Sequence, residues 1–312
     1  MGDPSIYALF GPTGVGKTEV ALALAERLRE RGEDPVAVSA DAMQVYTGLE
    51  TLTGAPSASE RAALEHRLVS FVEVGETFSA GSYAQLAHAE IDALLAAGRR
   101  PIVVGGTGLY LRAALAELDL LPPPRDGVRE RLSAELAADG PRALHARLAT
   151  VAPWAAVALE PTDGRRIVRA LEVLEAGELD RRSKIGRQIA RRQQDSQLWS
   201  EELRVPTLLA GLTMERAALY ARIDERVEEM VRAGAEEEVR RASATGASDT
   251  ATKALGFREL LAGDLEAMKR HTRQYARRQL TWMRKLGGIQ VIDVTGRAPG
   301  DVAAEILDSA GR

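Results

Sequence analysis

The chain has 312 residues, of which 45% are hydrophobic and 28% are charged, so it can bury one large core or two moderate ones. This composition excludes disordered, collagen-like and low-complexity proteins. No apolar run reaches the roughly 18 residues that a membrane-spanning helix needs, and the first residues lack the basic and apolar regions of a signal peptide. We therefore expect a cytoplasmic protein that acts as a monomer and has no membrane partner.

Cysteine is absent from the chain and histidine is scarce. The chain has no cysteine, which excludes disulfides, thiolate nucleophiles and cysteine-based metal sites. Its four histidines are too scattered to form a metal-binding motif. The net charge is −4, but residues 269–285 contain seven Lys or Arg and no acidic residue, and residues 164–192 contain nine basic and four acidic residues. We interpret the protein as an acidic body with two basic patches.

The first third of the chain predicts alternating strands and helices. Apolar runs indicate the strands, and amphipathic segments indicate the helices. This order is typical of an α/β fold with a parallel sheet flanked by helices. The expected elements are a strand at 5–10, a helix at 18–30, a strand at 35–40, a helix at 81–97 and a strand at 101–104.

The pattern changes after residue 118. A run of three prolines at 122–124 precedes Ala- and Arg-rich helical segments, which predicts an inserted all-helical domain at 119–203. Residues 1–118 and 204–312 would then form one α/β core. In its second part we expect a strand at 205–212, helices at 213–233, 234–244 and 264–286, a polar loop at 242–252, a strand at 289–294 and a terminal helix.

A phosphate-binding motif follows the first predicted strand. Residues 11–18, GPTGVGKT, match G-x-x-x-x-G-K-[ST] between a strand and a helix, the context that the motif requires. Glycines let backbone N–H groups face phosphate oxygens, Lys17 adds a positive charge, and the Thr18 hydroxyl can bind Mg²⁺. We call residues 11–18 the phosphate loop. Its candidate diphosphate-binding residues are Gly11, Thr13, Gly14, Val15, Gly16, Lys17 and Thr18, with Thr18 as the metal ligand.

Two further polar residues follow predicted strands. Hydrolases with such a loop usually place an acidic residue at the end of a later strand. Here the strand at 101–104 leads to Thr107, and the nearest carboxylate at a strand end is Asp41. Because ligands bind at the carboxyl edge of a parallel sheet, we expect Asp41 and Thr107 to face the phosphate loop. A helix N-cap is the alternative role for Asp41.

Taken in order, these motifs resemble those of the tRNA dimethylallyltransferases. The resemblance extends over nearly the whole chain, through GPTGVGKT (11–18), SADAMQVYTGLETLTGAP (39–56), HRL (66–68), FSAGSY (78–83), VVGGTGLYL (103–111), DGRRIVRALEV (163–173), LGFRE (255–259) and TRQYARRQLTWMRK (272–285). It implies transfer of the dimethylallyl group of dimethylallyl diphosphate to N6 of the adenosine immediately 3′ of a tRNA anticodon, with Mg²⁺ as cofactor. It also implies that the inserted domain grips the anticodon stem-loop.

The resemblance assigns residues to that chemistry. It implies that Asp41 is the carboxylate on the base side and that Thr107 lies near the reacting groups, so both are our catalytic candidates. In the basic helix, Gln274, Arg278 and Trp282 share one face while Arg273, Arg277 and Arg284 share another, so one face can pack and the other can meet phosphates. The candidate tRNA contacts are Asp41, Ala42, Met43, Gln44, Thr107, Arg129, Arg165, Arg166, Arg169, Arg273, Arg277 and Arg278.

The chain departs from the family pattern at four positions. Ala42 replaces a serine, Leu52 a glycine and Ala55 a lysine, and Glu65 stands where a proline is frequent. The basic run at 181–192 is also richer in charge than the family pattern, and it is either an RNA contact or a solvated face.

Two other functions remain open from the residues alone. A small-molecule kinase would use Asp41 to accept a proton from a substrate hydroxyl and would turn over ATP. A non-catalytic RNA-binding nucleotide sensor would have no use for Asp41. The large basic helix disfavours the kinase, because a metabolite does not need it.

Overall fold

The computed structural model describes residues 4–118, 127–177 and 201–310. The chain divides into two compact units, one formed by Met1–Glu117 with Glu201–Arg312 and the other by Leu118–Ser200. The basic run at 181–192 and the prolines at 122–124 lie outside the described residues.

The larger unit contains a parallel sheet flanked by helices, so the predicted α/β fold is confirmed. In the described residues this sheet has six strands in the order β3-β2-β4-β1-β5-β6. The strands are β1 (Ile6–Phe10), β2 (Pro35–Ser39), β3 (His66–Arg67), β4 (Arg100–Gly105), β5 (Thr207–Thr213) and β6 (Ile289–Asp293).

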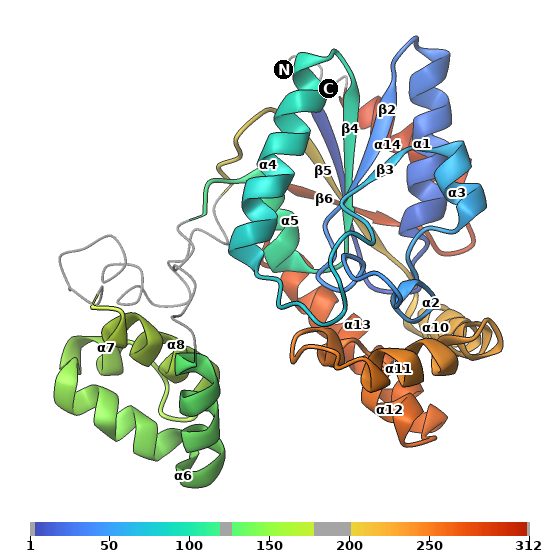
Figure 1. Ribbon diagram of the computed structural model, residues 1–312. Helices are drawn as coiled ribbons and strands as arrows, with labels where there is room; N and C mark the ends of the chain where they lie inside the picture. Colours follow the sequence, from blue (N-terminus) through green and yellow to red (C-terminus); the bar gives the residue numbers. More distant parts are fainter. Residues whose placement is uncertain (1–3, 119–126, 178–200, 311–312) are drawn as a thin grey trace. The chain divides into compact units, whose positions relative to one another are not determined.

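β1 lies in the middle of the sheet and every one of its residues is buried. Tyr7 pairs with Ile102 of β4 on one side and with Leu208 of β5 on the other. Apolar runs without alternation are typical of a strand covered on both faces. One face is covered by α4 (Ala80–Ala96) and α5 (Gly108–Leu115), and the other by α1 (Lys17–Glu30) and α14 (Pro299–Ala310), as Figure 1 shows.

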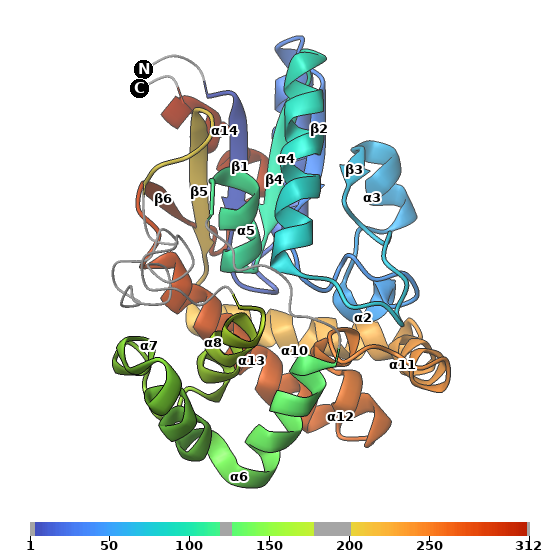
Figure 2. The same ribbon diagram turned by 60° about the vertical axis from the view of Figure 1, so that its left-hand side comes forward.

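A second layer of helices lies beyond the carboxyl edge of the sheet (Figures 1 and 2). It has its own apolar core, in which Tyr46, Leu49 and Phe257 are buried. The Glu238 carboxylate of α11 accepts the N–H groups of Thr51 and Leu52 at 2.9 Å each and so caps α2. The helices of this layer and its edge are α2 (Glu50–Thr53), α3 (Ala58–Ala63), α10 (Arg216–Arg232), α11 (Ala235–Ala244), η3 (Ala251–Lys253), α12 (Phe257–Leu261) and α13 (Leu265–Met283).

The smaller unit is helical in its described part. It contains α6 (Val128–Val151), α7 (Pro153–Val157) and α8 (Gly164–Glu175), packed through Leu148, Ile167 and Leu171. α6 is kinked at Gly140, whose φ of 78° and ψ of 167° are not helical and which precedes Pro141. Asp163 caps α8 by accepting the N–H of Arg166 at 3.2 Å.

Several short elements were not predicted from the sequence. They are β3, α2, α3, α5 and α12, and segments of two to eight residues carry too few positions for a periodic pattern. The basic helix ends at Met283 rather than 286, and the loop expected at 242–252 begins only after Ala244 and ends in η3. In the described part of the chain, no helix is long and apolar enough to cross a membrane.

The sheet holds β2 and β4 in unusually close contact where they end. A Cβ built on Gly105 would lie 2.2 Å from the backbone oxygen of Ala40. Since the obstacle is backbone, Gly105→Ala must push the two strand ends apart, and we expect it to cost about 1–3 kcal/mol of unfolding free energy in urea titrations. Gly81→Ala is the control, because its nearest atom is 3.6 Å away and it lies in α4. Equal stability of the two variants would contradict this prediction.

Candidate functional site

The loop between β1 and α1 has the backbone shape of an anion site. Gly14 and Gly16 adopt φ values of 81° and 96°, which side chains with a Cβ rarely allow. Gly16 is the N-cap of α1, so the first N–H groups of the helix belong to Lys17 and Thr18, two residues that line the cavity. The phosphate-loop motif therefore folds as a strand, a tight turn and a helix.

Lys17 is half-buried inside this loop. Its ammonium donates hydrogen bonds to the backbone oxygens of Gly11 at 2.9 Å and Pro12 at 3.0 Å. Burial lowers the pKa of Lys17 to about 8, an effect that the Asp41 carboxylate partly opposes and the Arg226 guanidinium reinforces. The side chain is thus a cation held in a site that favours its loss of charge until an anion arrives.

Asp41 and Thr107 both border the cavity, as the strand order predicted. Asp41 Oδ1 accepts the N–H groups of Met43 at 2.9 Å and Gln44 at 3.4 Å. This is a turn rather than a helix N-cap, since the next helix begins at Glu50. The Thr107 hydroxyl lies 3.5 Å from the N–H of Ala42 and 3.2 Å from the Tyr275 hydroxyl. Burial raises the pKa of Tyr275 to about 12, so it remains a neutral hydroxyl.

Arg226 of α10 is a functional candidate that the sequence analysis missed. Its side chain is half-buried, lines the cavity and places Nη2 3.5 Å from the oxygen of Gly54. Burial lowers its pKa from the ordinary value, and within the described residues it forms no carboxylate ion pair within 4.0 Å. The available signal was Arg222 and Arg226 at i and i+4 on a predicted helix, of which Arg222 pairs with Glu19 at 3.1 Å.

Gln44 is held rather than free. Its amide nitrogen donates to the Gly54 oxygen at 3.0 Å, and its amide oxygen accepts from the Ser39 hydroxyl at 3.0 Å. The Gly54 oxygen therefore receives both Gln44 and Arg226. Ala55 directly follows Gly54 and stands where the family pattern has a lysine. The half-buried guanidinium of Arg226 on α10 therefore lies one residue from that position.

The cavity itself has a volume of about 1270 Å³ and lies entirely within the larger unit. Single small-molecule pockets are about 300–1,000 Å³, so this one has room for more than a small molecule. Its walls come from the phosphate loop, the segments after β2 and β4, and helices α2, α10 and α13. Those elements also bring Ala42 and Met43 to the wall.

The basic helix α13 packs through a different face from either of the two proposed. Its buried side chains include Thr272, Ala276, Gln279 and Met283, a stripe at helical spacing. Arg273 is paired with Asp224 at 2.6 Å and belongs to the scaffold, whereas Arg277 is exposed. Arg278 lies 5.5 Å from the Tyr275 ring centre and borders the cavity, and Trp282 packs against Gly108.

In the smaller unit, two of the four candidate arginines share one buried carboxylate. Arg129 binds Glu172 through two nitrogens at 2.7 and 2.9 Å, and Arg169 reaches the same carboxylate at 2.6 Å. Burial alone would raise the pKa of Glu172, but these arginines hold it below its ordinary value. Both arginines therefore help to neutralise this buried carboxylate. Arg165 is exposed and Arg166 half-buried.

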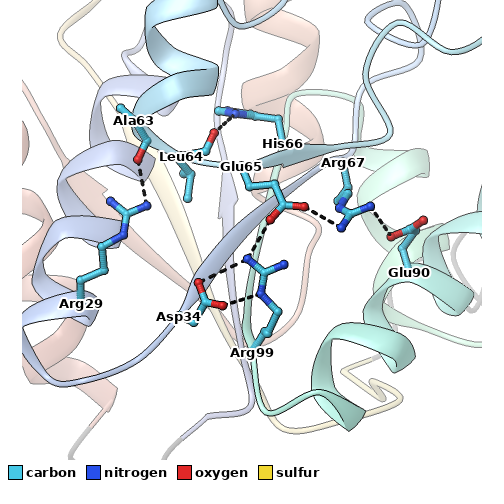
Figure 3. Close-up of polar contacts among 9 residues, drawn as sticks. All are labelled: Arg29, Asp34, Ala63, Leu64, Glu65, His66, Arg67, Glu90 and Arg99. Atoms are coloured by element: carbon cyan, nitrogen blue, oxygen red, sulfur yellow. Dashed lines mark hydrogen bonds and ion pairs between the residues drawn. The ribbon is translucent and has the colours of Figure 1, made fainter.

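Figure 3 shows the ion pairs and hydrogen bonds around the edge strand β3. Glu65 pairs with Arg99 at 2.8 Å and with Arg67 at 2.6 Å, and Arg99 also pairs with Asp34. Glu65 therefore gains ion pairs that the proline of the family pattern would lack. The next residue, His66, lines the cavity and donates from Nδ1 to the Leu64 oxygen at 2.6 Å, and burial lowers its pKa.

The fold and this cavity define an α/β protein with a phosphate loop. Comparisons with known proteins identify the family within this class. The model of the family described as IPP transferase matches residues 44–286. The tRNA dimethylallyltransferase of Thermobifida fusca is 43% identical over 292 residues, covering 90% of this chain and 87% of that protein. The chain belongs to the IPP transferase family, which confirms the resemblance inferred from the motifs.

Solved structures agree with this assignment. The full-length tRNA isopentenylpyrophosphate transferase of Bacillus halodurans superposes with a TM-score of 0.65 at 30% identity, covering 98% of this chain and 97% of that one. A eukaryotic dimethylallyltransferase acting on tRNA has a TM-score of 0.72 at 24% identity, covering 93% and 74%, and shares the fold.

The low pKa of Lys17 predicts a pH dependence of anion binding. Between pH 7 and 9 the charged fraction of a lysine with a pKa of about 8 falls about tenfold, so affinity for inorganic diphosphate should fall with it. Lys17→Arg keeps its charge throughout, because a guanidinium loses its proton only far above this pH range. We expect calorimetric affinities of the wild type, divided by those of Lys17→Arg, to fall about tenfold over this range. A constant ratio would contradict the prediction.

Proposed function

We propose that the protein transfers the dimethylallyl group of dimethylallyl diphosphate to N6 of the adenosine immediately 3′ of the anticodon in tRNA, releasing diphosphate. The observation that carries this proposal is the convergence of Lys17, Asp41 and Thr107 on one cavity. Membership in the IPP transferase family, whose relatives are enzymes named for this transfer, supports the same reaction.

The donor diphosphate would bind at the phosphate loop. Diphosphate leaves readily only when its growing negative charge is neutralised. Lys17, Arg226 and the N–H groups at the start of α1 can supply that neutralisation, because all of them border the cavity. Two half-buried cations whose nitrogens contact no carboxylate among the described residues are consistent with a site completed by an anionic substrate.

Magnesium fits this site as a partner of the diphosphate rather than of a protein cage. Among the described residues, no cluster of three acidic or histidine side chains could hold a metal. Thr18 lies on the cavity wall in the first turn of α1 and offers one hydroxyl ligand. Mg²⁺ commonly takes one or two protein ligands together with substrate phosphates and waters. When bound, it would add positive charge to the leaving diphosphate.

On the acceptor side, the Asp41 carboxylate would accept the proton that N6 loses. The N6 lone pair is delocalised into the adenine ring, so the amine is a weak nucleophile that benefits from a base. The Thr107 hydroxyl would orient the amine. The adenosine must leave its stack to reach the cavity, which costs a few kcal/mol.

The basic residues of both units would repay that cost by contacting RNA phosphates. Arg277 and Arg278 are exposed on α13, and Arg165 is exposed on α8. Arg273 contributes less, since Asp224 neutralises it. Phosphate contacts fix the position of the RNA without reading its sequence.

The direct test of the function combines the purified protein with dimethylallyl diphosphate, Mg²⁺ and unmodified tRNA whose anticodon is followed by adenosines. Nuclease digestion and mass spectrometry should then reveal prenylated adenosine. Rapid release of phosphate from ATP without tRNA would instead identify a kinase or ATPase. Binding of tRNA and diphosphate without any product would identify the sensor. The comparisons support neither alternative.

Asp41→Asn separates catalysis by the carboxylate from its role in the turn. Asparagine can still accept the N–H groups of Met43 and Gln44 through its amide oxygen, so the turn should persist. It cannot take up the N6 proton. We expect the single-turnover rate to fall by about 10²–10⁴, with tRNA affinity changed by less than about tenfold.

Asp308→Asn, on the exposed surface of α14, is the matched control for this measurement. Its rate should equal that of the wild type. A near-normal rate for Asp41→Asn would restrict Asp41 to the turn and leave catalysis to activation of the leaving group.

A further inference from the structure

The buried face of α13 carries a glutamine that touches two of the loops bordering the cavity. Gln279 is 4% exposed. Its amide oxygen accepts the N–H of Thr13 in the phosphate loop at 2.9 Å, and its amide nitrogen donates to the oxygen of Gly106 at 2.8 Å. In sequence these partners are 266 and 173 residues away.

We infer that Gln279 is a positioning residue: its single side-chain amide fixes the phosphate loop against the segment 105–108 and so sets the distance between Lys17 and Thr107. This inference rests on the proposed function only for the name of the reaction. The geometry that it describes concerns the diphosphate site itself.

The Gln279 amide can make both hydrogen bonds in only one orientation. The Thr13 N–H can only donate and the Gly106 oxygen can only accept, so a flipped amide would oppose donor to donor and acceptor to acceptor. A carboxylate can satisfy the Thr13 side alone, and an apolar side chain neither. The Gly106 oxygen is in a buried contact and the Thr13 N–H in a partly buried one, so leaving either group unpaired costs folding free energy.

Lys17 and Gln279 border the same point. A Cβ placed on Gly106 would lie 2.3 Å from the amide nitrogen of Gln279 and 3.5 Å from the ammonium of Lys17. The ammonium and the amide therefore pack around one backbone position. A shift of the amide would move the wall against which Lys17 rests.

The next residue of that face extends the same connection to the acceptor side. Tyr275, four positions earlier on α13, is 3.2 Å from the Thr107 hydroxyl, which in turn lies 3.5 Å from the N–H of Ala42 beside Asp41. One helical face thus joins the phosphate loop, the segment after β4 and the segment after β2. This face therefore holds both the phosphate loop, on the proposed donor side, and Thr107, on the proposed acceptor side.

The test compares Gln279→Met with Gln274→Met in the full-length protein. Methionine nearly preserves the length and volume of glutamine but makes neither hydrogen bond, and Gln274 is exposed on the same helix outside the cavity wall. Two quantities are measured for each variant: calorimetric affinity for inorganic diphosphate, and kcat/KM for dimethylallyl diphosphate at saturating tRNA. tRNA affinity and the thermal midpoint are recorded alongside.

For Gln279→Met we expect both quantities to fall by about 10–100-fold, the effect of loosening a catalytic geometry by about 1 Å. tRNA affinity should stay within about threefold, because α13 retains its exposed arginines. Gln274→Met should match the wild type. If Gln279→Met also matches, or if its diphosphate and tRNA affinities fall together with the thermal midpoint, Gln279 has no specific positioning role and the inference is wrong.

Gln279→Glu supplies a readout that a purely structural residue would not alter. It keeps the hydrogen bond from the Thr13 N–H but cannot donate to the Gly106 oxygen. Because the lost contact is the one that fixes the segment 105–108, kcat at saturating dimethylallyl diphosphate and tRNA should fall by about tenfold or more, and a kcat equal to that of the wild type would contradict the inference. If the wild type binds diphosphate but makes no prenylated adenosine, the proposed function fails while the binding measurements still decide the role of Gln279.

Discussion

The partial burial of two cations at one cavity is the constraint on which the rest of this structure depends. Lys17 and Arg226 are each half-buried. Desolvation lowers the pKa of both groups, and the Arg226 guanidinium adds to the effect on Lys17. Their nitrogens bind backbone oxygens, at Gly11, Pro12 and Gly54, instead of carboxylates. A carboxylate in contact would stabilise them but would also compete with a diphosphate. The arrangement therefore gives up stability in the free protein to keep positive charge available to a ligand.

Holding these cations requires two separate hydrophobic cores. The sheet and its flanking helices bury β1 and so fix where the phosphate loop begins. The layer of α10 to α13 buries Tyr46 and Phe257 and so fixes Arg226 and the segment that contains Gly54. Gln279 of α13 then connects the second layer to the phosphate loop and to Gly106, while Glu238 caps α2 within the second core. The cavity is lined from both cores, because the phosphate loop belongs to the first and Arg226 is fixed by the second.

The phosphate loop was largely predictable from the sequence, and the parts of the cavity formed by other segments were only partly so. The phosphate loop is contiguous, and its glycines, lysine and threonine act through local backbone geometry that sequence spacing encodes. Asp41 and Thr107 could be placed because parallel strands end at one edge of a sheet. The buried face of α13 was misassigned, because its arginines gave a stronger signal than Thr272, Ala276 and Gln279. For the same reason Arg273 was expected to meet RNA, yet it pairs with Asp224.

The sequence by itself determined the class of fold, the phosphate loop and the family, since each depends on residue types at short, regular spacing. Tertiary structure alone decided that Arg226 lies beside Gly54, that Glu238 caps a helix nearly 190 residues away, and that Gln279 meets Thr13. Such contacts depend on how separate helices pack, and packing is set by the volumes of many side chains at once rather than by any local pattern.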